Sequence, residues 1–449
     1  MSRLIARGSR FGVLSLIALV LLAACSNSTG SSGGAAATGG ASDVGVTPHE
    51  IMIGGLASAT GPLANQYSPI WDAVQAYLDQ VNAHGGVYGR KIVYSAKLDD
   101  GFNPSNDVTQ ARALVEQDNV FAVVGVASPE FSGGKYLAQQ NIPTFGWNIN
   151  PEFASGPSLF GLPGGSYLDF TDPGPTLPWL AKHLGTIRVA ALAYGVVQSF
   201  QCADGDEYVF TRQFKGFDFV LKDTSIPFGV QDLSADIQKI KNSNANLIVT
   251  CMDPGGNKII SQNLQEAGIY DQVKQYWPNG YDEDSLKAYA PYMQNVYFDT
   301  NGVVPYVYGY TKGMDDYLDA MRRHHITIGA VTLAGWMSAD LFVRALRAVG
   351  PNPTRAKVIK YVNSLTHYTA NNISPGINWT TAHNKSNGVT CTSFVQVQGN
   401  TFVPVFGTKT NPFICWHGTY TNSLDPVPFP NGPSFFDSTR PMSYPFTAG

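Results

Sequence analysis

Residues 50–56 read EIMIGGL, and the residues that follow, ASATGPLANQYSPI, extend to position 70. EIMIGGL is a short apolar run that predicts a buried strand. Ser68 and Pro69 then offer a helix N-cap and a first-turn proline. Apolar side chains recur at helical spacing until the pair Gly85-Gly86: Ile70, Val74, Tyr77, Leu78 and Val81. A strand, a loop and a helix in this order predict the first unit of an α/β fold.

The same alternation continues along the chain. Strands are predicted at KIVYSAKL (91–98), VFAVVG (120–125) and IPTFGW (142–147), with a helix that opens at Asn103-Pro104 after the first of them. Alternating strands and helices are typical of a parallel sheet with helices on both faces.

A second α/β unit follows the Gly/Pro-rich passage at 161–175. Its predicted strands are RVAALAYG, FDFVLKDTSI, NLIVTCM and VKQYW, separated by helical segments near 204–214, 233–242 and 258–267. Further helices are predicted at 329–349 and 354–365, and TSFVQVQGNTFVPVF (392–406) predicts a β-hairpin that turns at Gly399-Asn400. A chain of 449 residues is too long for one ordinary core, so we expect two domains or two lobes of one fold.

The N-terminal segment predicts export. Arg3, Arg7 and Arg10 precede the apolar run at 11–24, which ends directly before Cys25 in the sequence LAAC. This pattern is typical of a signal peptide, residues 1–24, and LAAC resembles a bacterial lipobox in which Cys25 is lipidated. A plain signal peptide with a chance cysteine is the alternative. The small-residue linker within 25–48 would be a flexible tether with a reach of roughly 20–25 Å, which holds the body at the outer face of the cell membrane.

Composition and cysteine usage agree with this location. Apart from Cys25 four cysteines remain, and sequence alone allows three disulfide connectivities. Of these we expect the pairs Cys202–Cys251 and Cys391–Cys415. Zinc binding is the rival use of the cysteines, but the sequence has no CxxC spacing and no clustered histidines. The net charge is −4 and no block of basic residues stands out beyond the N-terminus, so nucleic acid is not an expected partner.

Ligands of open parallel sheets bind beyond the carboxyl ends of the strands. The residues that follow the predicted strands therefore define a candidate site, which combines hydroxyls, carboxamides, an acid and aromatic rings: Ser58, Thr60, Tyr67, Ser128, Trp147, Asn148, Asp253, Asn279 and Tyr281. Such a mixture suits a small organic molecule. Structural roles compete with ligand contact at three positions: Trp147 can pack in the core, Ser128 can cap the following helix, and Asp253, before Pro-Gly-Gly, can cap a helix.

Four passages carry a resemblance to a known family: IMIGGLASATGPLANQY, DQVNAHGGVYGRKIVYSAKLDDGFNP, FAVVGVASPEFSGG and NIPTFGWNINPEF. In this order and spacing they resemble the first lobe of branched-chain amino-acid-type periplasmic substrate-binding proteins of ABC importers, the type I fold, here in a bacterial lipoprotein form. The resemblance extends more weakly over 49–415. It implies two lobes joined by three chain crossings, with lobe one at 49–164 and 301–371, lobe two at 165–300 and 372–420, and a tail at 421–449.

The resemblance also implies roles for single residues. Tyr67 matches a tyrosine that lines the pocket, Ser128 matches a hydroxyl that binds the ligand carboxylate, and Asp253 falls near a pocket tyrosine of lobe two. The segment Asn279 to Tyr281 falls near an acid that pairs with the ligand ammonium, for which Asp253 or Asp282 are possible substitutes. Asn148 and Ile149 occupy positions where amino-acid-binding members offer small residues and a hydroxyl.

At Asn148, Ile149 and the segment Asn279 to Tyr281 this chain differs from the residues that amino-acid-binding members offer. Simple leucine, isoleucine or valine is therefore not the expected ligand. Trp147 favours instead an aromatic acid, an amide or a modified amino acid. The expected partners are this solute, an ABC permease and the lipid anchor, for a monomer without cofactor. A sensor on the same fold is the alternative function, and an exported hydrolase is a third, for which the sequence offers no nucleophile with a matching base.

Overall fold

The first lobe is built on a five-stranded parallel sheet. The computed structural model describes residues 42–62, 64–163, 174–384, 390–418 and 421–445. The strand order is β2-β1-β3-β4-β5, and every neighbouring pair is parallel. The strands are β1 (Glu50–Ala57), β2 (Lys91–Asp99), β3 (Ala122–Ala127), β4 (Thr144–Trp147) and β5 (Leu159–Leu162).

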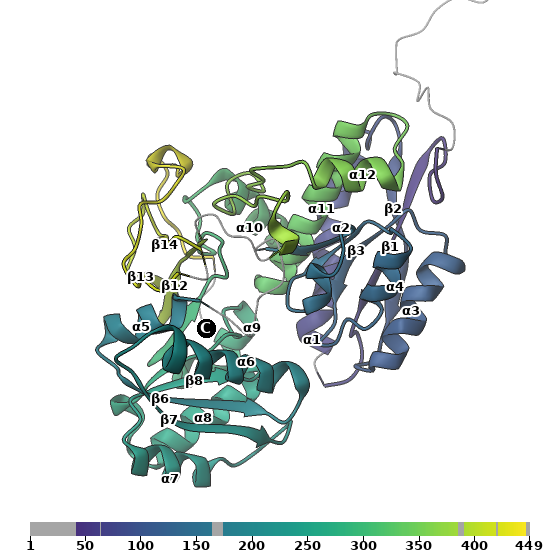
Figure 1. Ribbon diagram of the computed structural model, residues 1–449. Helices are drawn as coiled ribbons and strands as arrows, with labels where there is room; N and C mark the ends of the chain where they lie inside the picture. Colours follow the sequence, from purple (N-terminus) through teal and green to yellow (C-terminus); the bar gives the residue numbers. More distant parts are fainter. Residues whose placement is uncertain (1–41, 63, 164–173, 385–389, 419–420, 446–449) are drawn as a thin grey trace, which may run out of the picture. The chain divides into compact units, whose positions relative to one another are not determined.

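Helices cover both faces of this sheet, as Figure 1 shows. Ile51 and Ile53 of β1 pack with α2 (Pro69–Ala83) and α11 (Ala330–Val349) in one cluster of buried side chains. Val123 and Val126 of β3 pack on the other face with α3 (Pro104–Glu116) and α4 (Gly134–Gln139). The remaining helices that follow or join this lobe are α1 (Ala64–Tyr67), α10 (Lys312–His324) and α12 (Arg355–Val362).

The second lobe is built on a seven-stranded sheet of order β13-β12-β10-β9-β8-β6-β7. The strands β6 to β10 are parallel to their neighbours, whereas the hairpin β12–β13 joins β10 in antiparallel pairing. The strands are β6 (Arg188–Tyr194), β7 (Asp218–Ile226), β8 (Leu247–Cys251), β9 (Lys274–Tyr276), β10 (Val296–Asp299), β12 (Phe394–Gln398) and β13 (Thr401–Val405). The predicted α/β fold class is confirmed, and so is the hairpin.

Alternate residues of β6 enter two different cores. Val189, Ala191 and Ala193 pack with α5 (Thr176–Leu184) and α6 (Val197–Tyr208). Ala190 and Leu192 pack on the opposite face with α7 (Ser234–Ser243) and α8 (Pro254–Glu266). This period-two division is what a strand buried on both faces requires. A short helix, α9 (Glu283–Tyr289), follows β9.

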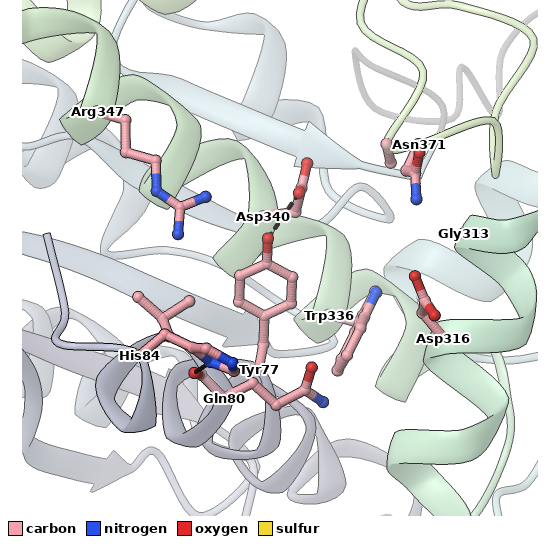
Figure 2. A pocket seen from close by; sticks show the side chains of 11 residues that line it. Tyr77, Gln80, His84, Gly313, Asp316, Trp336, Asp340, Arg347 and Asn371 are labelled. Atoms are coloured by element: carbon pink, nitrogen blue, oxygen red, sulfur yellow. Dashed lines mark hydrogen bonds between the residues drawn. The ribbon is translucent and has the colours of Figure 1, made fainter.

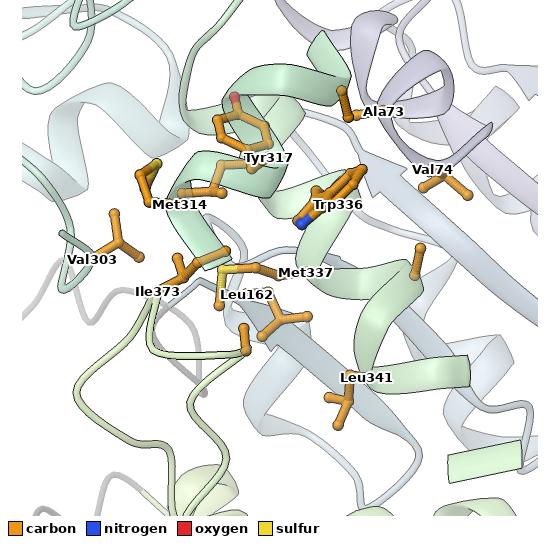
Figure 3. Close-up of a cluster of buried hydrophobic side chains, with 14 of the residues drawn as sticks. Ala73, Val74, Leu162, Val303, Met314, Tyr317, Trp336, Met337, Leu341 and Ile373 are labelled. Carbon is orange, nitrogen blue, oxygen red and sulfur yellow. The ribbon is translucent and has the colours of Figure 1, made fainter. Parts of the chain in front are cut away.

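The chain passes between the two sheets three times: from β5 to β6, from β10 to α10, and from α12 to β12. Two of these passages enter the core around α11. Val303 and Ile373 belong to the same buried cluster as Met314 of α10 and Met337 of α11, and Figure 3 shows these side chains together. The passages are therefore fixed by apolar packing on the first lobe.

The C-terminal residues from 421 to 445 pack on the body. The backbone amide of Val427 donates to the carbonyl of Cys415, and Tyr308 exchanges backbone hydrogen bonds with Ser443. Arg440 binds the carboxylate of Asp315, and the rings of Phe435 and Phe436 are buried.

Both expected disulfides are present. Cys202–Cys251 links α6 to the end of β8, and Cys391–Cys415 links β11 (Thr390–Thr392) to β14 (Ile414–Trp416), which form a separate two-stranded antiparallel sheet. Within the described ranges, no helix combines the length and the hydropathy that crossing a bilayer requires. The apolar run at 11–24, Cys25 and most of the linker lie outside those ranges.

Some local predictions were wrong. Ser68 makes no cap hydrogen bond, because α1 runs almost directly into α2 and leaves Ser68 in helical conformation rather than in the extended one that a cap needs. The second-lobe helix predicted at 204–214 begins earlier, at Val197, and α8 begins at Pro254 rather than at 258.

Candidate functional site

Polar side chains gather at the carboxyl ends of β1 and β2. The Ser58 hydroxyl donates to Asp100 Oδ1 at 2.5 Å, and both residues are buried. The Thr60 hydroxyl donates to Asp99 Oδ2 at 2.6 Å at an exposed position. These two predicted residues therefore bind the loop that follows β2, and they hold the loop after β1 in place.

Tyr67 and Trp147 meet beside these loops. Tyr67 ends α1 and Trp147 ends β4, and their ring centroids lie 5.6 Å apart. The two rings belong to one buried cluster with Trp71 and Ile149. Tyr67 is 6% exposed, and its hydroxyl makes no hydrogen bond to any described residue. Burial, with smaller contributions from the carboxylates of Asp100 and Asp253, raises the pKa of Tyr67, which therefore stays a neutral phenol.

Ser128 and the two asparagines after β4 are buried. The Ser128 hydroxyl donates to the carbonyl of Glu130 at 3.2 Å. The backbone amide of Asn148 donates to the carbonyl of Leu162 at 2.9 Å, and the Asn150 side chain donates to the carbonyl of Pro129 at 3.1 Å. The Ser128 hydrogen bond thus lies within the loop after β3, and the Asn150 hydrogen bond connects the loop after β4 to the loop after β3.

Asp253 caps α8, the structural role that the sequence left open for it. Its carboxylate accepts hydrogen bonds from the backbone amides of Gly255 and Gly256, at 3.0 and 3.3 Å. It also accepts a hydrogen bond from the hydroxyl of Tyr194, the last residue of β6. The carboxylate of Asp253 adds to the raised pKa of Tyr67, and the two lobes approach each other nearby, where the rings of Phe102 and Phe228 lie 6.2 Å apart between centroids.

Tyr281 lies elsewhere, in the core. Its ring stacks on Tyr306 with centroids 4.4 Å apart, and its hydroxyl accepts the backbone N–H of Tyr306 at 2.8 Å. The neighbouring Asp282 caps α9 through the backbone and hydroxyl of Ser285, and burial raises the pKa of its carboxyl. Asn279 donates to the carbonyl of Met252 at 3.2 Å, beside Asp253.

Three residues at the site were missed from the sequence. Tyr194 and Phe228 have ring centroids 4.9 Å apart, and the Gln198 side chain donates to the carbonyl of Ile149 at 3.4 Å. All three lie at or beyond the carboxyl ends of β6 and β7. The strand-end rule that found Asp253 would have found them too, had it been applied to these two strands.

Comparison with known proteins assigns the family. The model of a family described as periplasmic binding protein matches residues 50–401. The chain belongs to this family. A curated amino acid binding protein of Pseudomonas aeruginosa is 36% identical over 76 residues, a match that spans 17% of this chain and only 20% of that protein.

Solved structures of other periplasmic binding proteins share the fold. A fatty acid ABC transporter substrate-binding protein from Thermomonospora curvata superposes with a TM-score of 0.65 at 16% identity, over 84% of this chain and 95% of that one. A branched-chain amino acid transporter substrate binding protein from Streptococcus pneumoniae, in complex with isoleucine, gives 0.64 at 16% identity, over 79% and 99%. A solute binding protein from R. palustris, in complex with benzoate, gives 0.62 at 16% identity, over 83% and 99%. The expected type I fold is confirmed.

This periplasmic binding protein also carries a pocket of about 250 Å³ away from the candidate site. Figure 2 shows it between α2, α10 and α11. The Tyr77 hydroxyl donates to Asp340 at 2.7 Å, and the Tyr77 ring lies edge-on to Trp336 at 4.8 Å between centroids. The candidate site residues named from the sequence do not line this pocket.

One cluster in the described part of the chain has the composition of a metal site. Its members are Cys202, Asp206 and Cys251. The two sulfurs are joined in a disulfide, which removes the thiolates that a metal would need. Burial raises the pKa of Asp206 to about 8, so this carboxyl is largely protonated at neutral pH.

Proposed function

We propose that the protein is an extracytoplasmic solute-binding lipoprotein of an ABC transporter. It captures a small organic solute, amino-acid-like, amide or aromatic, between its two lobes by hinge closure and delivers it to a permease in the membrane. Membership of the periplasmic binding protein family already implies solute binding and an extracytoplasmic location.

The observation that carries this proposal is the contact between the Tyr67 and Trp147 rings, 5.6 Å between centroids, with the Asp253 carboxylate of the other lobe contributing to the raised pKa of Tyr67. Two of these residues come from the first lobe and one from the second, and all three follow or end a secondary-structure element at the edge where ligands of parallel sheets bind. Aromatic faces supply buried area to a solute, while the phenol and the carboxylate orient it. A solute that touches both lobes has a higher affinity for the closed state and so favours closure.

Lipidation of Cys25 is part of the proposal. Cys25 follows an apolar run and the small residues Leu-Ala-Ala, and a linker of small residues separates it from the body. The anchor would keep the loaded protein within reach of the permease. The named ligands of the structural neighbours, a fatty acid, isoleucine and benzoate, support a small solute with an apolar part.

A thermal-shift screen of the soluble body, residues 43–449, tests the proposal. The panel holds amino acids, aromatic acids, amides, amines and small sugars. A solute at a hundred times its dissociation constant adds about 2.7 kcal/mol to the free energy of unfolding, a clear rise in the midpoint. The hit is then titrated into Trp147→Ala, with Trp336→Ala as the matched control because Trp336 lines the other pocket.

Loss of binding in Trp147→Ala with retention in Trp336→Ala supports a solute site at Trp147. Loss of binding in Trp336→Ala with retention in Trp147→Ala indicates that the solute binds in the pocket between α2, α10 and α11. Absence of any shift across the panel, from folded and ligand-free protein, contradicts the function.

A further inference from the structure

An exposed apolar surface adjoins the candidate site on the second lobe. Eight large hydrophobic side chains are exposed in the described part of the chain, and three of them lie just beyond β6 and β7. Val196 is 40% exposed, Val197 49% and Phe228 38%. Tyr194 and Ile226 are the last paired residues of these strands, and Val196 and Phe228 follow them by two residues each. These exposed side chains therefore lie together at the edge of the sheet where ligands of parallel sheets bind.

Aromatic contacts connect this surface to the Tyr67–Trp147 side. The Phe228 ring lies 4.9 Å from the Tyr194 ring and 6.2 Å from the Phe102 ring, between centroids. Tyr194 in turn binds Asp253, and Phe102 packs against the cluster that holds Tyr67 and Trp147. A solute held by Asp253 would therefore have apolar surface beside it from both lobes.

The charges near the site are acidic. Asp100 and Asp253 both act on Tyr67, whose pKa they raise in addition to the effect of burial. Asp253 forms no ion pair with a lysine, arginine or histidine of the described residues, and its hydrogen-bond donors are two backbone amides and a phenol. A carboxylate can accept roughly four hydrogen bonds, so Asp253 keeps room for a further donor.

The lysines nearest in sequence to Asp100 and Asp253 interact with other residues. Lys97 lies 4.0 Å from the Asp72 carboxylate and 5.0 Å above the Tyr94 ring. Lys258, in the first turns of α8, binds Gln262 and lies 5.1 Å above the Tyr292 ring. Asp253 has no cationic partner among the described residues, so a carboxylate ligand placed beside it would meet a like charge, which is costly in a closed site. An ammonium would instead meet a carboxylate and several aromatic faces, the arrangement that favours organic cations.

We infer that the solute is a hydrophobic amine: its ammonium binds at Asp253 beside Tyr67 and Tyr194, and its apolar body packs on Phe228, Val196 and Trp147. This inference rests on the proposed function and names the class of its solute. It separates this chain from the structural neighbours whose named ligands, a fatty acid and benzoate, carry a carboxylate without an amine.

Calorimetric titration of three compounds of matched shape tests the inference. The compounds are 2-phenylethylamine, phenylacetamide and phenylacetate, titrated into the body at residues 43–449. We expect the amine to bind at least tenfold more tightly than the amide, and phenylacetate to bind most weakly. Tighter binding of phenylacetate than of the amine overturns the inference.

The outcomes separate this inference from the function on which it rests. If none of the three binds while a solute of the screening panel other than an amine does, the solute class is wrong and the proposed function stands. If no compound of the whole panel binds, both fail.

Two variants and a matched control locate the contacts. Asp253→Asn keeps an oxygen that can cap α8 and removes the charge, since Asn and Asp are comparable N-caps. It should weaken amine binding at least tenfold and leave amide binding within about twofold. Phe228→Ser should weaken all three compounds about tenfold, through lost apolar contact.

Ile187→Ser is the control, because Ile187 is 50% exposed and precedes β6, at the opposite end of the strand from Val196. It should change no affinity. Equal losses of amine and amide binding in Asp253→Asn, or unchanged binding in Phe228→Ser, would contradict the assignment of these contacts.

Discussion

The rings of Tyr67 and Trp147 lie 5.6 Å apart and inclined at 59°. They come from the end of a four-residue helix and the end of a four-residue strand, α1 and β4. Tilted aromatic pairs of this kind contribute roughly 0.5–1.5 kcal/mol beyond their buried area. The pair therefore gives the candidate site a fixed wall that need not form when a solute arrives.

Removal of the Tyr67 hydroxyl separates a structural role from a binding role. The hydroxyl makes no hydrogen bond to a described residue, so Tyr67→Phe should change the free energy of unfolding by less than about 0.5 kcal/mol. Solute affinity should fall about tenfold, because one oriented polar contact is lost. Urea denaturation and calorimetric titration measure the two effects. A loss of more than about 1.5 kcal/mol of stability with unchanged affinity would assign Tyr67 to the fold alone.

Asp206 should make the protein less stable as the pH rises towards 8. Burial raises the pKa of its carboxyl to about 8, and Cys251 Sγ lies 3.5 Å from the Asp206 carboxylate. The folded state thus holds a proton that the unfolded state loses above its ordinary pKa of about 3.9. Between pH 4 and 8 the unfolded state binds fewer protons, and this carboxyl lowers stability by up to about 1.4 kcal/mol per pH unit.

Asp206→Asn removes this dependence and keeps the size of the side chain. Its stability relative to the wild type should increase steadily from pH 5 to pH 8, as urea denaturation at each pH would reveal. Parallel stability curves for the two proteins would mean that Asp206 is ionised in the folded state.

The two disulfides should stabilise the fold by similar amounts. They close loops with sequence separations of 24 and 49 residues, for which the chain-entropy model gives about 3.5 and 4 kcal/mol. The double variants Cys391→Ala/Cys415→Ala and Cys202→Ala/Cys251→Ala should each lose roughly 3–4 kcal/mol in denaturant titration. A negligible loss for the first pair would indicate that the sheet β11–β14 is held by its other contacts.

The packed C-terminal tail gives a fourth prediction. Phe436 is buried against the rings of Tyr310, Phe413, Phe429 and Phe435. Phe436→Ala should therefore cost about 3 kcal/mol of stability, the usual loss for a buried phenylalanine. Tyr444→Ala is the matched control, since Tyr444 is exposed, and should change stability by less than about 0.5 kcal/mol. Equal, small effects would mean that the tail leaves the body in solution.

Much of the fold follows from apolar periodicity. The strands β1, β3, β6 and β8 are short apolar runs, and the long helix α11 has a continuous helical pattern. The hairpin could be predicted because its turn needs a residue with positive φ, which Gly399 supplies. The helix α10 was missed although its signals are present: Thr311 caps it, and Met314, Leu318 and Met321 follow at helical spacing. The many charged residues of α10 made its apolar positions difficult to recognise in the sequence.

The candidate site was less accessible to sequence reasoning. The strand-end rule placed Trp147 and Asp253 correctly at the ends of β4 and β8, because it depends only on where strands stop, whereas Tyr67 ends α1, a helix that was not predicted. It could not foresee that Tyr281 stacks on Tyr306, a contact between segments 25 residues apart. The sheet β11–β14 was not predicted, because its strands of three residues are too short to show an alternation of apolar and polar residues.

The most direct test of the account is a crystal structure of the body, residues 43–449, with the solute that gives the largest thermal shift. We predict electron density for that solute in contact with Tyr67, Trp147 and Asp253, with both lobes closed on it. Density for the solute only in the pocket lined by Tyr77 and Trp336 would contradict the central claim.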